Sequence, residues 1–388
     1  MKLTALAAHT PEAVRAALAA RGWESQASWF AATGVQPVVV LLEDIDDAER
    51  EGLVHWSAKA GADVLTGVGW ALVATAASRL APLARPDRVP EALAGLSPEL
   101  ARFLVALADP PRAWEVRGTT VALDRPVILG ILNVTPDSFS DGGKFSDAER
   151  ALAHAEHLMA DGAQLIDVGG ESTRPGAGVV AAADEIARVV PVIAELARRK
   201  LGLVTVDTRK AEVARAALDA GAVAVNDVSG LAFDPGLGET VARAGAGLIV
   251  MHMRGTPDTM DRLATYTHVA PEVAAELSGA AARAERAGIP RERIVVDPGF
   301  GFAKTPAHNL RLLDELATIA GLGYPVAVGP SRKRFLGAAT GRPVEDRDRA
   351  TAVACALAWE RGARIFRVHD AALAREALTL AHAVGTPG

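Results

Sequence analysis

The sequence predicts an α/β protein built around a closed (β/α)8 barrel, on the evidence of a repeat that runs from Val127 to the C-terminus. Eight short apolar runs recur there, and each ends in a cluster of polar, charged or glycine residues. Stretches rich in Ala, Leu, Arg and Glu, long enough for helices, separate them. Short β-branched runs that alternate with helices are typical of parallel strands buried on both faces. Eight such units in about 260 residues match a TIM barrel, whose active site lies at the carboxyl ends of the strands.

The site residues are expected at the carboxyl ends of the predicted strands. Side chains that follow them converge on one rim of a barrel, so residues far apart in the sequence become neighbours. The eight runs are Val127–Asn133, Leu165–Val168, Leu203–Asp207, Ala222–Asn226, Leu248–Met251, Ile294–Asp297, Pro325–Val328 and Ile365–Val368.

The front of the chain differs in composition from the rest. Five of the six tryptophans fall within the first 114 residues, and Pro110-Pro111 marks a boundary. We therefore expect an N-terminal α/β extension of unknown role at residues 1–110 and the barrel at residues 111–388. The elements expected in the extension are a helix from Thr10 to Gly22, strands at Val38–Leu42 and Asp63–Leu65, and helices at Asp44–Gly52, Ala71–Leu80 and Ser97–Ala108.

Composition excludes several functional classes. The formal net charge of −6 argues against a general nucleic-acid surface. A single cysteine, Cys355, excludes an intramolecular disulfide and a cysteine-cluster metal site. The apolar N-terminal stretch is interrupted at His9, Pro11 and Glu12, and no 18-residue apolar span occurs. We expect a cytoplasmic protein that acts on small molecules, with neither nucleic acid nor membrane as a partner.

The first two strands run into loops with distinct chemistry. Asn133–Gly143 is rich in Gly, Ser and Asp and predicts a mobile lid, because an ordinary turn needs fewer residues and neither Phe139 nor Asp141. The loop after the second strand reads GGESTRPGAG. Its flexible backbone, its hydroxyl groups and its forked guanidinium suit a phosphate or diphosphate, which makes Thr173 and Arg174 candidates.

Carboxylates and amides end three further strands, at Asp207, at Asn226-Asp227 and at Asp297. One carboxylate can accept two N–H bonds from the N–C–N edge of a flat heterocycle, and asparagine both donates and accepts. A divalent-metal site built from the same carboxylates is the alternative. A structural role as a helix N-cap is the third option, and it suits Asp227 best because Asn226 already ends the strand.

Aromatic and sulfur side chains accompany these strand ends. Phe300 and Phe302 lie in DPGFGFAK, where either ring could flank a planar substrate, and Phe300 suits the core equally well. The thioether of Met251 suits the face of a heterocycle, although a core position is the safer interpretation. His252 is expected to be structural.

Basic residues follow the last two strands, where barrels commonly bind phosphate. Arg332 and Arg334 are interpreted as solvated. The candidates for function in these two loops are Ser331, Lys333, Arg367 and His369.

The whole set resembles the ordered motifs of the dihydropteroate synthase family. The matching segments are NVTPDSFSDGG, GGESTRPG, DPGFGFAK, GPSRK and RVHD, together with Asp207 and Asn226-Asp227, and they span roughly Trp114 to the C-terminus. The resemblance implies a TIM barrel that uses Mg²⁺ to join p-aminobenzoate to 6-hydroxymethyl-7,8-dihydropterin diphosphate, releasing diphosphate. The first 110 residues do not match.

The resemblance also implies a role for each candidate. Asp141, Lys333, Arg367 and His369 are the expected catalytic residues, and a homodimer through late barrel helices such as Thr351–Arg361 is implied. By the same resemblance, Asp207, Asn226, Asp297 and Lys333 hold the pterin, with Met251 nearby; Asn133 ligates Mg²⁺; Arg367 and His369 bind the diphosphate; Thr173, Arg174, Phe302 and Ser331 border the p-aminobenzoate; and Phe139 and Asp141 lie on the closing loop.

Two other functions compete with this interpretation. A methyltetrahydrofolate–corrinoid methyltransferase would share the Asp/Asn pocket but would not need Thr173-Arg174 or the Arg367–His369 segment. A non-catalytic homologue would be expected to have lost polar site residues, whereas every expected position is filled.

Overall fold

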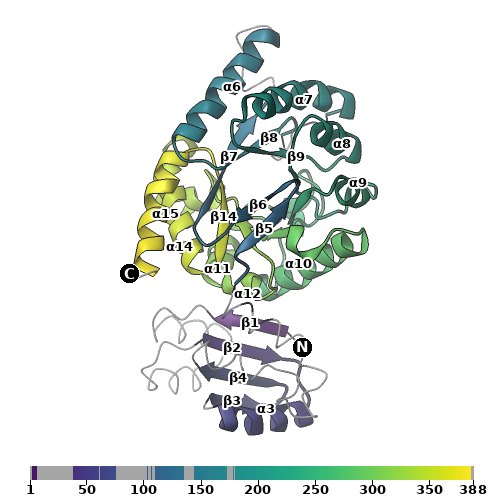
Figure 1. Ribbon diagram of the computed structural model, residues 1–388. Coiled ribbons are helices and arrows are strands. Elements are labelled where there is room, and N and C mark those ends of the chain that lie inside the picture. Colours follow the sequence, from purple (N-terminus) through teal and green to yellow (C-terminus); the bar gives the residue numbers. More distant parts are fainter. Residues whose placement is uncertain are drawn as a thin grey trace. The chain divides into compact units, whose positions relative to one another are not determined.

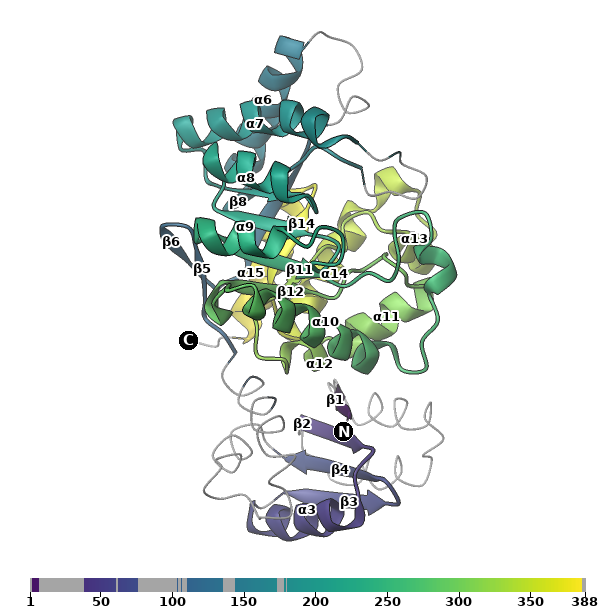
Figure 2. The same cartoon turned by 90° about the vertical axis from the view of Figure 1, so that its right-hand side faces the viewer.

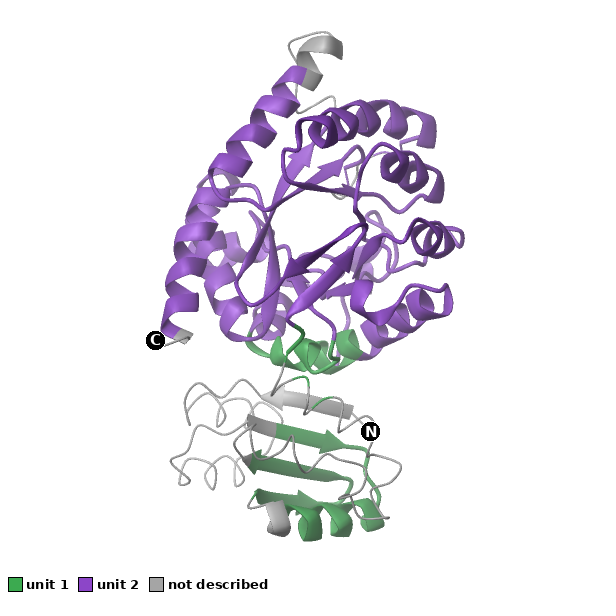
Figure 3. Ribbon diagram, viewed as in Figure 1, with its two compact units in different colours: residues 1–111, 268–274, 314–323 green, residues 112–267, 275–313, 324–388 purple. Residues whose placement is uncertain are grey.

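The computed structural model describes residues 2–6, 38–60, 62–75, 103, 106, 110–134, 144–172, 178 and 180–385. The chain divides into two compact units, which are coloured separately in Figure 3. The first comprises residues 1–111, 268–274 and 314–323, and the second comprises residues 112–267, 275–313 and 324–388. No helix in these described ranges is both long and apolar enough to cross a membrane.

Eight parallel strands of the second unit close into a barrel, which confirms the predicted fold (Figure 1). Around the barrel the order is β10-β11-β12-β13-β14-β7-β8-β9, so each strand pairs with its neighbours in sequence and β14 closes on β7. All eight expected runs are strands. They are β7 (Val127–Asn133), β8 (Leu165–Gly169), β9 (Leu203–Asp207), β10 (Ala224–Asp227), β11 (Gly247–Met251), β12 (Ile294–Asp297), β13 (Val326–Val328) and β14 (Ala363–Val368).

Helices follow the strands and surround the barrel (Figures 1 and 2). Their inward faces are apolar; in α7, for example, Val189, Ile193 and Leu196 are fully buried. The helices are α6 (Lys144–Ala160), α7 (Ala182–Arg199), α8 (Ala211–Asp219), α9 (Leu237–Ala244), α10 (Val269–Arg286), α11 (Pro306–Asp314), α12 (Ala317–Ala320), α13 (Arg334–Thr340), α14 (Asp348–Glu360) and α15 (Ala371–Gly385), with short 3-10 turns η4 (Met260–Leu263), η5 (Arg291–Arg293) and η6 (Val344–Asp346).

A hairpin that the sequence did not predict closes the amino-terminal end of the barrel. It consists of β5 (Ala113–Val116) and β6 (Thr119–Ala122). Trp114 is fully buried against the first residues of the strands, and its indole N–H donates to the Arg293 carbonyl at 2.9 Å. The hairpin lies at the end opposite α13 in Figure 2. Ligands therefore have access to the carboxyl-terminal rim.

The first unit contains an antiparallel sheet in the order β1-β2-β4-β3. Its helix α3 (Asp47–Ala60) begins with a capping box, in which the Glu49 N–H donates to the Asp46 carboxylate and the Asp46 N–H donates to the Glu49 carboxylate. The strands are β1 (Lys2–Leu6), β2 (Val38–Glu43), β3 (Asp63–Gly67) and β4 (Trp70–Thr75).

The expected helix at Ala71–Leu80 is wrong, because residues 70–75 form strand β4. Alanine and leucine favour a helix in isolation, but a Val68-Gly69 turn reverses the chain directly after β3. β4 then pairs with β3 on one side and with β2 on the other, and this tertiary pairing overrides local propensity. The helix expected from Thr10 and most of the helix expected at Ser97–Ala108 lie outside the described residues.

Candidate active site

The strand register brings the predicted polar residues to one level of the barrel rim. Asn133 is paired with Gly169, Gly169 with Asp207, and Asp207 with Asn226. On the next strands along, Met251 is paired with Asp297. Residues that are about 20 to 45 positions apart in the sequence are therefore paired on neighbouring strands, as the barrel prediction requires.

Arg367, near the end of β14, joins this group through two carboxylates. Its Nε donates to Asp167 Oδ2 at 2.5 Å, and its Nη2 donates to Asp207 Oδ2 at 2.7 Å. The side chain reaches inward from β14 and is 22% exposed, so part of it remains accessible. The two carboxylates fix the fork in place, and this preorganises a cation for an anionic ligand.

Sequence reasoning missed Asp167. Its carboxylate is fully buried inside the barrel, where it accepts hydrogen bonds from the Thr205 hydroxyl, from Asn226 Nδ2 at 2.9 Å and from Arg367. It thus orients two predicted site residues at once. The available signal was a charged residue in the middle of the strand run LIDVG, because a strand buried on both faces admits a carboxylate only when that carboxylate is paired.

Burial and the neighbouring charges set the ionisation of this group. Burial raises the pKa of Asp207 to about 7, although Arg367 opposes the rise. Burial by itself would lower the pKa of Arg367, but Asp167 and Asp207 outweigh it and the pKa is raised. The guanidinium therefore stays charged. The single positive charge is shared by two carboxylates, so Asp207 is poised to accept a proton or a ligand N–H.

Asp297 ends β12 as a buried acceptor. Its Oδ1 receives the Gly299 N–H at 2.7 Å. Burial raises the pKa of Asp297 to about 6, against that hydrogen bond and the nearby charges of Lys333 and Lys304. At neutral pH it is ionised and able to accept two N–H groups from a heterocycle edge.

The structure separates the two phenylalanines of DPGFGFAK. Phe300 belongs to the core, where its ring stacks on Phe335 at 5.7 Å between centroids. Phe302 lies under the Lys333 ammonium, which is 4.1 Å from the ring centroid. Met251 is 5% exposed and packs with Phe302 in a small apolar cluster, so the thioether forms part of the wall next to Asp297.

A buried lysine holds the loop that carries these residues. Lys304 Nζ donates to the carbonyls of Gly299 at 3.1 Å and Phe302 at 2.9 Å, and contacts His252 Nδ1 at 2.9 Å. His252 in turn bonds Glu276 through Nε2 at 3.0 Å. Burial lowers the pKa of Lys304 to about 7 and that of His252 to about 4. These contacts give His252 the structural role expected for it.

Other candidates are linked across neighbouring loops. Ser331 Oγ contacts His369 Nδ1 at 2.9 Å and accepts the His369 backbone N–H at 3.2 Å, so the loops after β13 and β14 are tied together. Asp227 is fully buried and accepts the N–H groups of Ser229 at 2.8 Å and Leu231 at 2.5 Å. Its role is structural, but it holds a turn and does not cap a helix as expected, since the next helix, α9, begins only at Leu237.

The two arginines interpreted as solvated are both paired. Arg332 makes two bonds of 2.8 Å with Asp348, and its side chain is 38% exposed. Arg334 bonds Asp261 at 2.9 Å and is 66% exposed. For Arg332 the solvated interpretation is wrong, because the carboxylate of α14 lies within reach of both guanidinium donors.

Four charged residues support the loop after β8. Lys210 Nζ donates to Glu171 at 2.9 Å and also to Glu185, while Arg209 Nη2 donates to Glu171 at 3.2 Å. Glu171 also accepts the Val180 N–H at 3.2 Å, so it links the two ends of the segment that contains Thr173 and Arg174. Thr173 and Arg174 lie outside the described residues, as do Phe139 and Asp141.

Asn133 is the expected ligand of a metal ion. Its amide is a hard oxygen ligand at the rim, and Mg²⁺ in proteins is commonly held by one or two such oxygens together with substrate phosphates and water. Among the residues that the structure describes, no group of three or more His, Cys, Asp or Glu side chains is arranged for a metal. A single rim amide of this kind fits a metal ion whose other ligands are substrate phosphates and water.

Comparisons with known proteins agree with this geometry. The model of the family described as "Pterin binding enzyme" matches residues 129–369. A dihydropteroate synthase from Synechocystis sp. is 44% identical over 248 residues, which cover 63% of this chain and 86% of that protein. A probable bifunctional folylpolyglutamate synthase/dihydropteroate synthase from Halobacterium salinarum is 49% identical over 247 residues, covering 64% of this chain but only 30% of that longer protein.

A solved structure matches at the level of the fold. Dihydropteroate synthase from Xanthomonas albilineans, in complex with 7,8-dihydropteroate, superposes with a TM-score of 0.65 at 42% identity and covers 71% of this chain and all of that one. The residues matched by the family model, 129–369, run from the first barrel strand, β7, to the end of the last, β14. This chain belongs to the pterin-binding enzyme family.

Proposed function

We propose that this protein is a dihydropteroate synthase, which condenses 6-hydroxymethyl-7,8-dihydropterin diphosphate with p-aminobenzoate to give 7,8-dihydropteroate and diphosphate. One observation carries the proposal beyond pterin binding. A buried acceptor, Asp297, and a carboxylate-fixed cation, Arg367, lie on one barrel rim, so a single ligand can present a heterocycle to the first and an anionic tail to the second.

In this proposal the central side chains hold the pterin. Asp297 accepts N–H groups from the pterin edge, Asn226 and Asp207 bond its other polar atoms, and Lys333 lies over it beside Phe302. Support comes from the burial of Asn226 and Asp297 and from the ring contact of Lys333. A polar heterocycle is recognised best where unpaired polar groups would otherwise be buried.

The diphosphate lies at the edge of the barrel rim. Arg367 and His369 bind it there and stabilise the negative charge that grows as the C–O bond breaks. When bound through Asn133, Mg²⁺ would neutralise part of the charge on the departing anion. The electron-rich pterin delocalises the positive charge left on its methylene carbon.

The second substrate then attacks this carbon. We propose that closure of the first loop, which carries Phe139 and Asp141, lets Asp141 stabilise the cation and creates the p-aminobenzoate site. Thr173, Arg174, Phe302 and Ser331 border that site. Departure of diphosphate before attack gives an SN1-like order. A secondary deuterium isotope effect near unity at the methylene carbon would reject this order.

Diphosphate release tests the function directly. The purified chain is mixed with the pterin diphosphate and Mg²⁺, with and without p-aminobenzoate. Release that requires p-aminobenzoate supports the synthase. Pterin binding without release would favour a non-catalytic protein, and methyl transfer from methyltetrahydrofolate to a corrinoid protein would favour the methyltransferase.

Metal dependence gives a separate prediction. Removing Mg²⁺ with a chelator is expected to lower kcat/KM for the pterin diphosphate by about 100-fold, because the leaving group loses charge neutralisation. Asn133→Ala should raise the Mg²⁺ concentration needed for half-maximal activity, while leaving the affinity for pterin without diphosphate unchanged. An unchanged Mg²⁺ requirement in this variant would remove Asn133 as a ligand.

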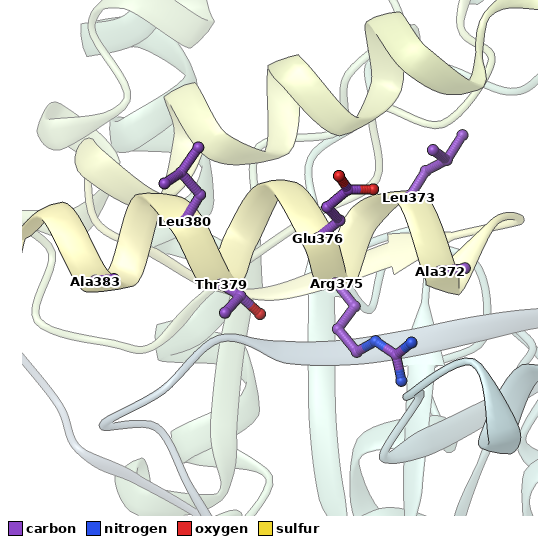
Figure 4. A pocket seen from close by; sticks show the side chains of 7 residues that line it. All are labelled: Ala372, Leu373, Arg375, Glu376, Thr379, Leu380 and Ala383. Atoms are coloured by element: carbon purple, nitrogen blue, oxygen red, sulfur yellow. The ribbon is translucent and has the colours of Figure 1, made fainter.

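We also propose a cytoplasmic homodimer that associates through α14 and α15. Val353 and Leu357 on α14 and Leu380 and Val384 on α15 are apolar yet exposed, at 59%, 38%, 69% and 68%. The two helices pack together, and a hollow of about 630 Å³ runs beside α15 (Figure 4). Leu380 projects from one side of this helix, and Arg375 and Thr379 from the other (Figure 4). Exposed apolar side chains on two helices that pack together support a protein interface at these helices.

Leu380→Glu is therefore expected to convert the dimer to a monomer in sedimentation velocity measurements, because two like charges would be brought together at a two-fold contact. Leu310→Glu on α11 is the matched control, since Leu310 is 45% exposed but lies outside this face. A wild-type chain that sediments as a monomer would contradict the proposal.

A further inference from the structure

We infer that Arg332 is a positioning residue, which holds its own backbone in a left-handed conformation against the first turn of α14 and thereby directs Ser331 and Lys333 into the site. The inference rests on the proposed function for its kinetic readouts. It concerns a residue that touches neither substrate in that proposal, and it explains why an arginine lies between two side chains of the site.

The backbone of Arg332 is unusual for a residue with a side chain. Its φ is +56°, in the region that favours glycine because a Cβ is crowded there. Such a conformation persists where the surroundings impose it, and it is common at functional sites. A specific set of contacts should therefore be found around this residue.

Those contacts all come from the start of α14. The Arg332 N–H donates to Thr351 Oγ1 at 3.1 Å, and its carbonyl accepts from Arg347 Nη1 at 3.2 Å. Its guanidinium makes two parallel bonds of 2.8 Å with Asp348. Thr351 is itself buried and donates its hydroxyl to the Arg347 carbonyl at 2.9 Å. The N–H, the carbonyl and the side chain of one residue are thus all held by one helix end.

The residues on either side carry the proposed chemistry. Ser331 is held by His369, and Lys333 lies over Phe302 and precedes α13 as its N-cap residue. A change of φ at residue 332 rotates the chain between them, so Ser331 and Lys333 could not both keep their places. A displacement of about 1 Å in a site of this kind can reduce the rate about 100-fold.

A comparison of alanine with glycine at position 332 tests whether Arg332 positions Ser331 and Lys333. Arg332→Ala removes the guanidinium and keeps a Cβ that opposes the left-handed conformation, whereas Arg332→Gly removes the same guanidinium and adopts that conformation without strain. We expect kcat/KM to fall about 100-fold in the alanine variant and to recover at least tenfold of this loss in the glycine variant. Asp348→Asn, which removes the charge of the carboxylate that bonds Arg332, should also lower kcat/KM, by a smaller factor.

Lys200 provides the matched control pair. It also has a left-handed φ, +55°, but it caps the end of α7 away from the rim. Lys200→Ala and Lys200→Gly should differ in melting temperature and not in kcat or KM. If Arg332→Ala does not fold, as judged by circular dichroism, the comparison of Arg332→Gly and Asp348→Asn with the wild type still tests the inference.

Binding separates this inference from the proposed function. Calorimetry with 6-hydroxymethylpterin, without turnover, should show weaker binding in Arg332→Ala than in the wild type and partial recovery in Arg332→Gly. Wild-type pterin binding without diphosphate release would reject the synthase proposal alone. Equal pterin affinity and equal KM values in the wild type, Arg332→Ala and Arg332→Gly would overturn the inference.

Discussion

Arg367→Met is expected to lower kcat about 1,000-fold and to destabilise the protein by about 3 kcal/mol. The first effect follows from the loss of the fixed cation that faces the departing diphosphate. The second follows because Asp167 and Asp207 would remain buried close together without the guanidinium that now bonds both. The measurements are steady-state diphosphate release and denaturant unfolding monitored by fluorescence.

A second substitution separates these two effects. In Arg367→Met/Asp167→Asn the buried like-charge pair is gone, so much of the lost stability should return while kcat remains low. The single variant Asp167→Asn is the control, because it keeps Arg367 bonded to Asp207. Recovery of kcat together with stability would show that Arg367 acts only through the fold.

Asp297→Asn is expected to reduce kcat/KM for the pterin diphosphate about 10,000-fold while raising the stability of the unliganded protein. Asparagine can still accept the Gly299 N–H through its amide oxygen, but it offers an N–H where the pterin edge also offers one. The loss should appear in pterin affinity by calorimetry as well as in turnover. An affinity within tenfold of the wild type would remove Asp297 from the heterocycle site.

The gain in stability follows from the sign of the pKa change. The pKa of Asp297 is raised by burial from 3.8 to about 6, so the folded protein holds this proton more tightly than the unfolded chain. Between these pH values stability falls as pH rises, and at pH 7 the buried carboxylate costs on the order of 3 kcal/mol. A neutral amide avoids this cost. The acid limb of wild-type kcat/KM near pH 6, where the carboxylate is protonated, should be absent in the variant.

The site residues that could be predicted from the sequence lie near strand ends, and the one that was missed lies within a strand. Asp207, Asn226, Asp297 and Arg367 were predictable because strand ends of a closed barrel must meet at one rim, whatever the helices between them contain. Asp167 was not predicted, because it lies within a strand and its partner Arg367 is 200 residues away in the sequence. The sequence around either residue does not indicate which residue it will pair with.

The local sequence also did not predict the contacts of Arg332, the different positions of the two phenylalanines or the strand β4. Arg332 reads as an exposed basic residue until α14 brings Asp348 and Thr351 beside it. Phe300 and Phe302 each follow a glycine in the sequence, but only Phe300 stacks on Phe335. β4 was taken for a helix because its composition suits one, and two flanking strands decided otherwise.

The sequence by itself determined the barrel, the order of its strands and the rim on which the chemistry lies, because a strand buried on both faces leaves a periodic apolar pattern that is readable within a few residues. Only the tertiary structure decided which carboxylates share Arg367, which aromatic ring borders the site and what holds Arg332 in place. These depend on distances between segments brought together by folding, and burial makes each such pairing strong enough to set charge and conformation.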